Sequence, residues 1–253
     1  MKIIAITQAR TGSTRFPGKI LKKINDNTLL EIHLKRILQS KEINQLIVAT
    51  TINKEDSGIV TISRDLGLSF YQGSVEDVLD RFYQSLQGQK ADYIVRLTSD
   101  CPLVDPELID QIIRYTLDNN LDYCSNTLDP KYPDGQDVEV FKFAALEKAW
   151  KEATLPSERE HVTPYIWKNS TFKGGKLFKS DNFDEGYSYG HLRMTVDEPN
   201  DFDVISDIIA NNGNNSTWLE YANYLENNLQ LKKVNASIVR NEGYNKSINK
   251  DNN

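Results

Sequence analysis

The sequence predicts an α/β protein built on a mostly parallel β-sheet with helices on both faces. Three observations support this prediction. Short apolar runs suited to buried strands alternate with amphipathic helical segments through the first half of the chain. The first apolar run leads directly into a loop of small and basic residues, which is typical of ligand-binding α/β folds. The 253 residues suffice for a sizeable core in one domain.

The elements of the first half follow from hydrophobic periodicity. Strands are expected at residues 2–7, 45–50, 70–71 and 92–98. Helices are expected at residues 28–39, 53–66, 74–86 and 106–117, the last three capped by Asn53, Ser74 and Asp105. Because ligands bind beyond the carboxyl ends of parallel strands, the loops that start at Gln8 and Ser99 should lie together.

The second half is less regular. Residues from about 122 to 190 mix short strands, turns and one or two helices, interrupted by prolines and glycines. We expect this region to form a lid and a surface for acceptor binding and dimerisation. A strand at residues 191–196 and helices at 199–210 and 217–229 should follow. A single domain then spans residues 1–239, and residues 240–253 form a polar, flexible tail.

The overall composition excludes several classes of protein. A net charge of -6 and a pI near 5.2 argue against a dedicated nucleic-acid binder, so any phosphate site must be a local cluster of cations. Cys101 and Cys124 have neither metal-ligand spacing nor a disulfide pattern. Met1 leads straight into a strand, and no apolar run approaches the length of a membrane span. A soluble cytoplasmic protein is expected.

The loop from Gln8 to Lys19 is the strongest candidate for a binding site. Gly12 and Gly18 allow close approach of the backbone to a ligand, and the Ser13 hydroxyl and the loop amides can donate hydrogen bonds. Three cations lie within ten positions: Arg10, Arg15 and Lys19. The pattern is neither a P-loop nor a Gly-x-Gly-x-x-Gly fingerprint. It predicts a polyphosphate-binding loop.

Two carboxylates follow predicted strands and precede predicted helices. Asp100 is the first candidate ligand for Mg²⁺, and Asp197 offers the second. Magnesium is usually held by one or two carboxylates together with water and phosphate oxygens. The alternative for both residues is helix capping, a role we assign to Asp105. Glu198 and Asp201 are expected to favour a helix N-terminus by their charge.

The loop resembles the signature of the cytidylyltransferases that activate sugars. These are the acylneuraminate and 3-deoxy-manno-octulosonate cytidylyltransferases and especially the SpsF-like branch of spore-coat polysaccharide synthesis. The family pattern is an apolar strand followed by Gln/Pro-Ala-Arg-x-Gly-Ser-x-Arg-x-Pro-Gly-Lys, and every element occurs here. Five other segments extend the resemblance: Gly73–Arg81, Thr98–Leu103, Asp134–Glu139, Ser157–Tyr165 and Arg193–Asp201.

The resemblance implies a Rossmann-like nucleotide-diphospho-sugar transferase fold and a homodimer. It also implies transfer of a nucleoside monophosphate, from CTP in the family, to a sugar acid or sugar phosphate with release of pyrophosphate. Arg10, Arg15 and Lys19 would be the catalytic cations and Asp100 and Asp197 the Mg²⁺ ligands. Nucleotide-binding roles fall on Ala9, Arg10, Gly12, Ser13, Arg15, Lys19 and Arg81, and acceptor-binding roles on Asp137, Glu139, Arg159 and His161.

Several alternatives stay open at this point. A glycosyltransferase could use a ready-made nucleotide sugar on a similar fold, and a scaffold protein could bind nucleotide without turnover. Asp201-Phe-Asp203 has the metal-binding spacing of many glycosyltransferases but falls inside a predicted helix. Arg81 could instead lie on a solvated helix face, and His33 and His191 are expected to be structural. The sequence leaves open whether the acceptor atom is a hydroxyl, phosphate or phosphonate oxygen.

Overall fold

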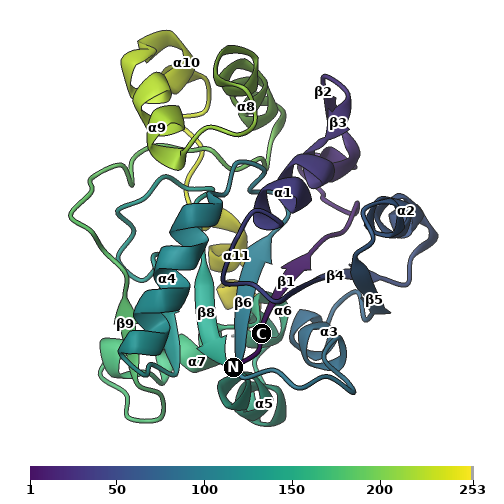
Figure 1. The fold of residues 1–253 in the computed structure, drawn as a ribbon, viewed down its shortest axis with the longest axis vertical. Helices are drawn as coiled ribbons and strands as arrows, with labels where there is room; N and C mark the ends of the chain where they lie inside the picture. The colour runs from purple at the N-terminus through teal and green to yellow at the C-terminus, as the bar shows by residue number, and fades with distance from the viewer. Residues whose placement is uncertain (252–253) are drawn as a thin grey trace.

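The computed structural model describes residues 1–251 and places a seven-stranded sheet between two sets of helices (Figure 1). The strand order is β5-β4-β1-β6-β8-β7-β9. The strands are β1 (Ile3–Gln8), β4 (Gln45–Thr51), β5 (Ser69–Gly73), β6 (Tyr93–Thr98), β7 (Tyr123–Ser125), β8 (Glu139–Lys142) and β9 (Ser180–Asn182), and a separate hairpin pairs β2 (Lys23–Ile24) with β3 (Asn27–Thr28).

The helices of the first half connect the parallel strands. They are α1 (Leu29–Ile37), α2 (Ser57–Asp65), α3 (Val78–Gln84) and α4 (Pro106–Asp118), with short 3-10 turns η1 (Lys19–Leu21) and η2 (Lys54–Asp56). The later helices are α5 (Phe143–Glu152), α6 (Pro156–His161), α7 (Pro164–Lys168), α8 (Pro199–Asn212), α9 (Trp218–Asn227), α10 (Leu229–Val234) and α11 (Glu242–Lys250), with η3 (Thr171–Lys173).

The pairing of the strands confirms the predicted fold class. Strands β5, β4, β1 and β6 run parallel to one another, as alternating strands and crossover helices require. Strand β8 lies antiparallel to both β6 and β7, and β9 is parallel to β7. The region at residues 122–190 therefore contributes three strands to the main sheet.

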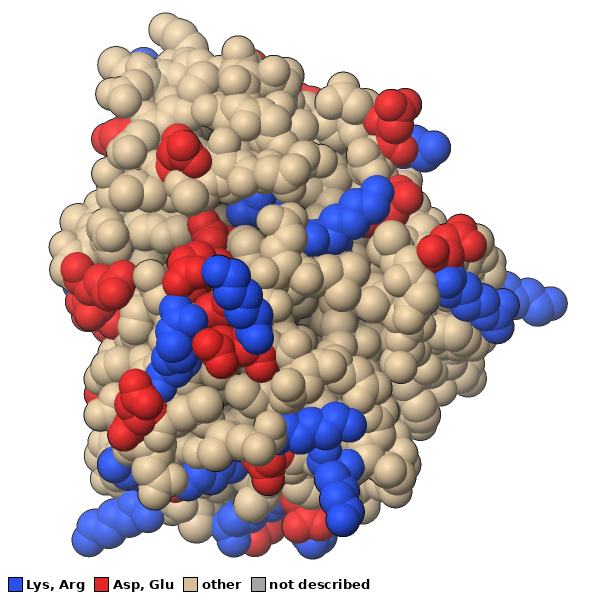
Figure 2. Space-filling model, in the orientation of Figure 1, with Lys and Arg blue, Asp and Glu red and all other residues tan. Residues whose placement is uncertain are grey.

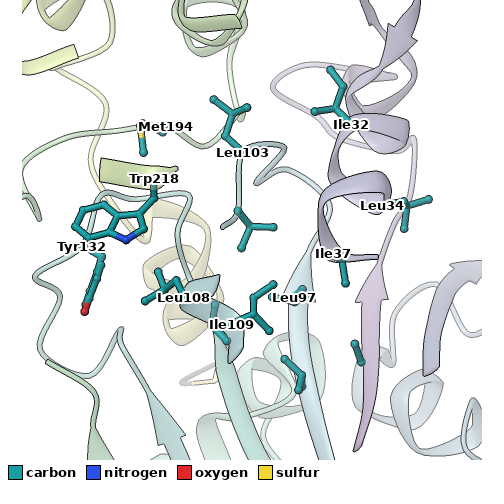
Figure 3. Close-up of a cluster of buried hydrophobic side chains, with 14 of the residues drawn as sticks. Ile32, Leu34, Ile37, Leu97, Leu103, Leu108, Ile109, Tyr132, Met194 and Trp218 are labelled. Atoms are coloured by element: carbon teal, nitrogen blue, oxygen red, sulfur yellow. The ribbon is translucent and has the colours of Figure 1, made fainter. Parts of the chain in front are cut away.

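Two apolar cores lie on opposite faces of the sheet. Along β1, Ile3 and Ala5 enter one core while Ile4 and Ile6 enter the other, because successive side chains of a strand alternate between faces. The larger core joins the sheet to α1, α4, α8 and α9, and Figure 3 shows side chains from α1, β6 and α4 gathered in it. The smaller core packs α3, α5 and α7 against the opposite face. A sheet buried on both faces gives the strand ends a rigid base.

Helix capping agrees with the sequence at one predicted position and differs at two. Asp105 caps α4 as expected, since its carboxylate accepts hydrogen bonds from the Glu107 and Leu108 amides. Helix α3 begins at Val78 with Asp77 as its cap, while the Ser74 hydroxyl accepts a bond from the Asp77 amide one turn earlier. Asn53 precedes η2 without a side-chain cap bond.

Three predicted elements require correction. Residues 191–196 form no ladder, and only an isolated bridge joins Arg193 to Asp134. The predicted helix at 217–229 is divided at Asn228, which ends α9 and caps α10. The expected tail from residue 240 contains α11, which packs against α6; residues 252–253 of that tail lie outside the described residues. Within residues 1–251, no helix has the length and apolar character needed to cross a membrane.

His33 is buried completely and joins two functional segments. Its Nδ1 lies 2.9 Å from the Cys101 carbonyl oxygen and its Nε2 lies 2.8 Å from the Thr7 hydroxyl. Since a carbonyl can only accept, Nδ1 carries the proton and Nε2 accepts from Thr7. Burial lowers the pKa of His33 to about 4, because desolvation disfavours the imidazolium more than the Cys101 carbonyl and Asp100 favour it.

The low pKa of His33 predicts a pH-dependent loss of stability. The unfolded chain takes up a proton near the ordinary pKa of about 6.5, whereas the folded chain resists protonation down to about pH 4. The contribution of His33 is therefore present above pH 6.5 and is lost as the pH falls to 4, by about 3 kcal/mol. Urea unfolding across this range should show the loss in the wild type. His33→Gln should not show this loss of stability. Equal pH dependence of the unfolding free energy in the wild type and His33→Gln would contradict the assignment.

Candidate active site

The candidate site lies where the order of the sheet reverses. From β1 the chain proceeds outward to β4 and β5, then returns to place β6 on the other side of β1. The loops that leave the carboxyl ends of β1 and β6 diverge at this point and open a crevice. Lys19 in the first loop and Asp100 in the second meet there, with the Lys19 ammonium 3.2 Å from the carboxylate of Asp100.

The first loop is fixed by a buried carboxylate that sequence analysis missed. Asp56 Oδ1 accepts bonds of 2.7 Å from both the amide and the hydroxyl of Thr11, and Asp56 Oδ2 accepts from the Thr51 hydroxyl. The Gly18 amide closes the loop by donating to the Thr11 carbonyl at 2.9 Å, with Gly18 in the left-handed region at φ 68°. These bonds hold the loop folded over the end of β1.

Lys19 lies between the two carboxylates that the sequence assigned to a metal. Its ammonium is 2.8 Å from Asp197 Oδ1 in addition to the contact with Asp100, and the residue is only 7% exposed. Burial alone lowers the pKa of Lys19, but Asp100 and Asp197 outweigh it and raise the pKa above the ordinary value. For Asp100, burial raises the pKa, yet the Lys19 ammonium reverses the effect and brings it to about 2.

A first cavity of about 520 Å³ opens beside this cluster. Every residue that the resemblance assigned to the nucleotide lines it: Ala9, Arg10, Gly12, Ser13, Arg15, Lys19 and Arg81. Arg10 is exposed at its rim, while Arg15 pairs with Asp197 at 2.9 Å. The cavity therefore collects the cations of the loop on one wall, as a polyphosphate site requires.

Arg81 is a buried cation without a carboxylate partner among the described residues. It is 1% exposed, donates from Nη1 to the Ser74 carbonyl at 2.6 Å, and leaves its Nε without a hydrogen-bond acceptor. Burial lowers the pKa of Arg81 to about 10, and the nearby Arg10 adds to this effect. Since an incompletely paired buried guanidinium is costly, a ligand in the first cavity is the expected partner.

A second cavity of about 420 Å³ adjoins the first. Seven residues line both cavities: Gln8, Arg15, Thr98, Asp100, His161, Asp197 and Gly243. Asp137 and Glu139, two of the predicted acceptor ligands, line only the second. Asp100 and Asp197 therefore lie at the boundary between the two cavities, where groups bound in each would meet.

The carboxylates Glu139 and Asp137 of the second cavity pair with half-buried arginines. Glu139 pairs with Arg96 and also accepts bonds of 2.6 Å from the Tyr123 and Thr163 hydroxyls. Glu139 thus supplies the carboxylate partner of Arg96, which lies in strand β6. Asp137 receives a bond of 2.6 Å from Arg240. Burial raises the pKa of Asp137, although the Arg240 charge opposes this.

Arg193 organises the Asp197 side of the site and was not among the predicted site residues. Its guanidinium contacts Asp134 at 2.6 Å, Asp201 at 2.8 Å and Asp197 at 3.1 Å. Burial first and the neighbouring Asp137 second raise the pKa of Asp134 to about 7, against the pull of Arg240 and Arg193. The signal for this network was present in the Arg193–Asp201 segment, but no sequence pattern shows that Asp134 lies opposite.

Two predicted acceptor residues have different positions. His161 lines both cavities, with Nε2 3.0 Å from the Ser247 hydroxyl. Arg159 lies elsewhere: its guanidinium pairs with Asp77 at 2.6 Å and donates to the Trp150 carbonyl at 2.8 Å. Arg159 joins α6 to α3 and is absent from the walls of both cavities.

The residues present fit a magnesium ion. Asp100 and Asp197 approach one another closely enough for the Lys19 ammonium to contact both, so a cation is already stabilised between them. Within residues 1–251 no cluster of three or more acidic, histidine or cysteine side chains forms a closed metal cage. Two carboxylates suit Mg²⁺, which completes its shell with water and phosphate oxygens.

Comparison with known sequences identifies the family. The sequence model of the cytidylyltransferase family matches residues 4–233, which include the whole first loop, Asp100 and Asp197. The chain belongs to the cytidylyltransferase family. It is therefore a nucleotidyltransferase of the CTP-dependent type, and the glycosyltransferase alternative is set aside. Asp201, which suggested that alternative, lies in α8 and binds Arg193.

Individual relatives agree with this assignment. The uncharacterized protein MJ1063 of Methanocaldococcus jannaschii is 42% identical over 241 residues, covering 94% of this chain and 96% of its own. The spore coat polysaccharide biosynthesis protein SpsF of Bacillus subtilis is 32% identical, over 80% of this chain and 84% of its own. A solved cytidylyltransferase of Leptospira borgpetersenii superposes with a TM-score of 0.85 at 31% identity, over 92% and 97% of the two chains. The predicted resemblance is confirmed.

Proposed function

We propose that this cytidylyltransferase transfers CMP from CTP to a sugar-type acceptor and releases pyrophosphate. The observation that carries the proposal is the pair of adjoining cavities, which meet at Asp100 and Asp197. The first cavity has the loop cations needed for a triphosphate, and the second has polar groups suited to an acceptor. The α-phosphorus of CTP would lie at their boundary, within reach of an acceptor oxygen.

The loop residues account for triphosphate binding and charge stabilisation. Arg10, Arg15 and Lys19 would neutralise the phosphates as negative charge builds on the leaving pyrophosphate. Arg81 would complete its hydrogen bonds on the nucleotide. Mg²⁺ held by Asp100 and Asp197 would supply further charge neutralisation on the phosphate oxygens. Lys19, which now contacts both carboxylates, would then direct its ammonium to a phosphate oxygen.

The chemistry of the transfer is a displacement at phosphorus. The acceptor oxygen forms a bond to the α-phosphorus, and the bond from the α-phosphorus to the oxygen bridging to the β-phosphorus breaks. A hydroxyl acceptor loses its proton in the process, whereas an ionised phosphate or phosphonate has none to lose. Such transfers depend on positioning and electrostatics more than on covalent participation of the protein.

The second cavity favours an acceptor rich in hydroxyl groups. Two of its arginines, the half-buried Arg96 and the buried Arg193, already have carboxylate partners, so the wall offers hydrogen-bond acceptors and donors without a large excess of positive charge. Trp167 and Tyr244 add aromatic surface against which the apolar face of a sugar ring can pack. His161, at the boundary, is placed to contact the acceptor or the α-phosphate.

The biological context of the proposal comes from the relatives. The name of the Bacillus subtilis relative places that protein in spore coat polysaccharide biosynthesis, which supports a role in surface glycan synthesis here. Figure 2 shows acidic and basic side chains intermixed on the visible face, with no broad basic surface there that would suit a nucleic acid. The homodimer that the resemblance implied and the cytoplasmic location expected from the sequence form part of the same proposal.

Pyrophosphate release tests the function. The protein is incubated with Mg²⁺ and each of CTP, UTP, GTP, ATP and dTTP, against a panel of sugar acids, sugar phosphates and sugar phosphonates. Release with CTP and one acceptor class, abolished by a chelator and restored by Mg²⁺, is the expected result. Release with another triphosphate would contradict the choice of CTP. Turnover of a CMP-sugar without pyrophosphate formation would contradict the reaction itself.

A further inference from the structure

The C-terminal segment, defined here as residues 235–251, begins just after the stretch matched by the family model and closes over the site. The match ends at residue 233, yet Asn241, Glu242, Gly243, Tyr244, Lys246 and Ser247 contribute to the cavity walls. In Figure 1 the yellow-green α9 and α10 lie at the top of the molecule, whereas α11 lies near the centre of the view and packs against α6. The chain therefore returns to the site after completing its last outer helices.

Several contacts fix α11 in this position. Asp251 accepts bonds of 2.9 Å and 2.5 Å from the amide and hydroxyl of Ser157 in α6. Ser247, only 3% exposed, donates to Glu160 at 2.8 Å and lies 3.0 Å from His161. Tyr244 packs edge-on against the His161 ring, with centroids 5.1 Å apart. Helix α11 is thus a docked element rather than a loose end.

A chain of ion pairs runs from the Asp197 carboxylate to α11. Asp197 contacts Arg15 at 2.9 Å, Arg15 contacts Glu242 at 2.9 Å, and Glu242 contacts Lys246 at 2.6 Å. Glu242 therefore places a carboxylate between two cations of the first cavity, one from the loop and one from the helix. Two cations that share an anion in this way are also placed to share a phosphate group.

We propose that α11 is part of the nucleotide site and that Lys246 is a further triphosphate ligand, with Glu242 occupying the anion position until the triphosphate displaces it. The inference rests on the proposed function. Lys246 lines the first cavity and is linked to Asp197, where the α-phosphate would react, by three successive ion pairs through Glu242 and Arg15. It therefore contacts the β- or γ-phosphate. On arrival of the triphosphate, Glu242 releases Arg15 and Lys246 to bind phosphate oxygens.

Nucleotide binding by calorimetry tests the inference in the full-length protein. Lys246→Ala should weaken the binding of CTP about tenfold, since one charge-assisted contact is lost, and should leave the binding of CMP unchanged. Glu242→Gln should bind CTP more tightly, about threefold or more, because the competing carboxylate is neutralised. Lys233→Ala, on the exposed surface of α10, is the matched control and should bind both nucleotides as the wild type does.

The outcomes separate this inference from the proposed function. Wild-type affinity for CTP in Lys246→Ala, or an equal loss for CTP and CMP, would overturn the role of Lys246 while leaving the enzyme assignment intact. Weaker CTP binding in Glu242→Gln would overturn the displacement and make Glu242 a positioning residue for Arg15. A wild-type protein that binds no nucleoside triphosphate at all would overturn both the inference and the function on which it rests.

Discussion

Replacing Lys19 by alanine is expected to lower kcat/KM by about a thousandfold while the protein stays folded. The ammonium is a buried cation of the first cavity that contacts both boundary carboxylates, Asp100 and Asp197, where negative charge would accumulate as pyrophosphate leaves. Removing a preorganised charge from such a place typically costs about 2.7–4 kcal/mol of transition-state stabilisation. Asp197 keeps Arg15 and Arg193 as partners, so the fold should survive.

Steady-state kinetics with pyrophosphate detection measures the effect, and urea unfolding verifies the fold. Lys23→Ala is the matched control, because Lys23 is an exposed lysine only four residues away. Lys19→Arg should recover little activity, since a planar guanidinium does not replace a compact ammonium between two carboxylates. Asp100→Ala should also cut turnover severely. Near-normal turnover in Lys19→Ala or Asp100→Ala would contradict the mechanism.

Replacing Gly135 by alanine is expected to destabilise the protein by about 3–4 kcal/mol and to abolish activity. Gly135 has φ 111°, a conformation that side chains disfavour, and a Cβ there would lie 2.5 Å from the backbone carbon of Met194. The clash is with backbone, so no side-chain rotation relieves it. The bridge between Asp134 and Arg193 would have to open, and Asp197 would lose an ordered partner.

A control variant at Gly88 separates the cost of backbone strain from the cost of the steric clash in Gly135→Ala. Gly88 also has positive φ, at 76°, but a Cβ there meets no atom of the described residues within 4 Å. Gly88→Ala should therefore cost about 1 kcal/mol, from strain alone, and leave activity intact. Thermal and urea unfolding provide the comparison. Equal destabilisation in the two variants would show that the clash with Met194 does not contribute to the loss of stability in Gly135→Ala.

The predictions from the sequence agree with the structure where the interactions involved join residues that are close together in the chain. Strands β1, β4 and β6 were predicted because each contains a continuous run of apolar residues, which is typical of a parallel strand buried on both faces. The Asp105 cap was predicted because its partners are two and three residues away. The strand expected at residues 191–196 is apolar for another reason. Leu192, Met194 and Val196 fill the larger core, while Asp134 supplies only a single bridge.

The candidate site shows the same difference between short-range and long-range interactions. The first loop could be recognised from the sequence because its cations and glycines are close neighbours in the chain. Asp56, by contrast, reaches Thr11 from 45 residues away, and a short polar segment gives no sign of such a bond. The position of Arg159 outside the two cavity walls has a related cause. Its motif matched the family, but the folded chain places Asp77 and the Trp150 carbonyl within reach of its guanidinium.

The sequence by itself determined the fold class and the family, and it singled out the first loop and the two carboxylates as candidates, since each depends on local pattern or on a contiguous motif. The tertiary structure decided how these parts combine. Lys19 lies between Asp100 and Asp197 only because β1 and β6 are neighbours at the switch point of the sheet. Helix α11, which its polar composition predicted to be a flexible tail, is ordered by the hydrogen bonds from Ser157 to Asp251 and by packing on α6. Such contacts join residues far apart in the chain, and only folding brings them together.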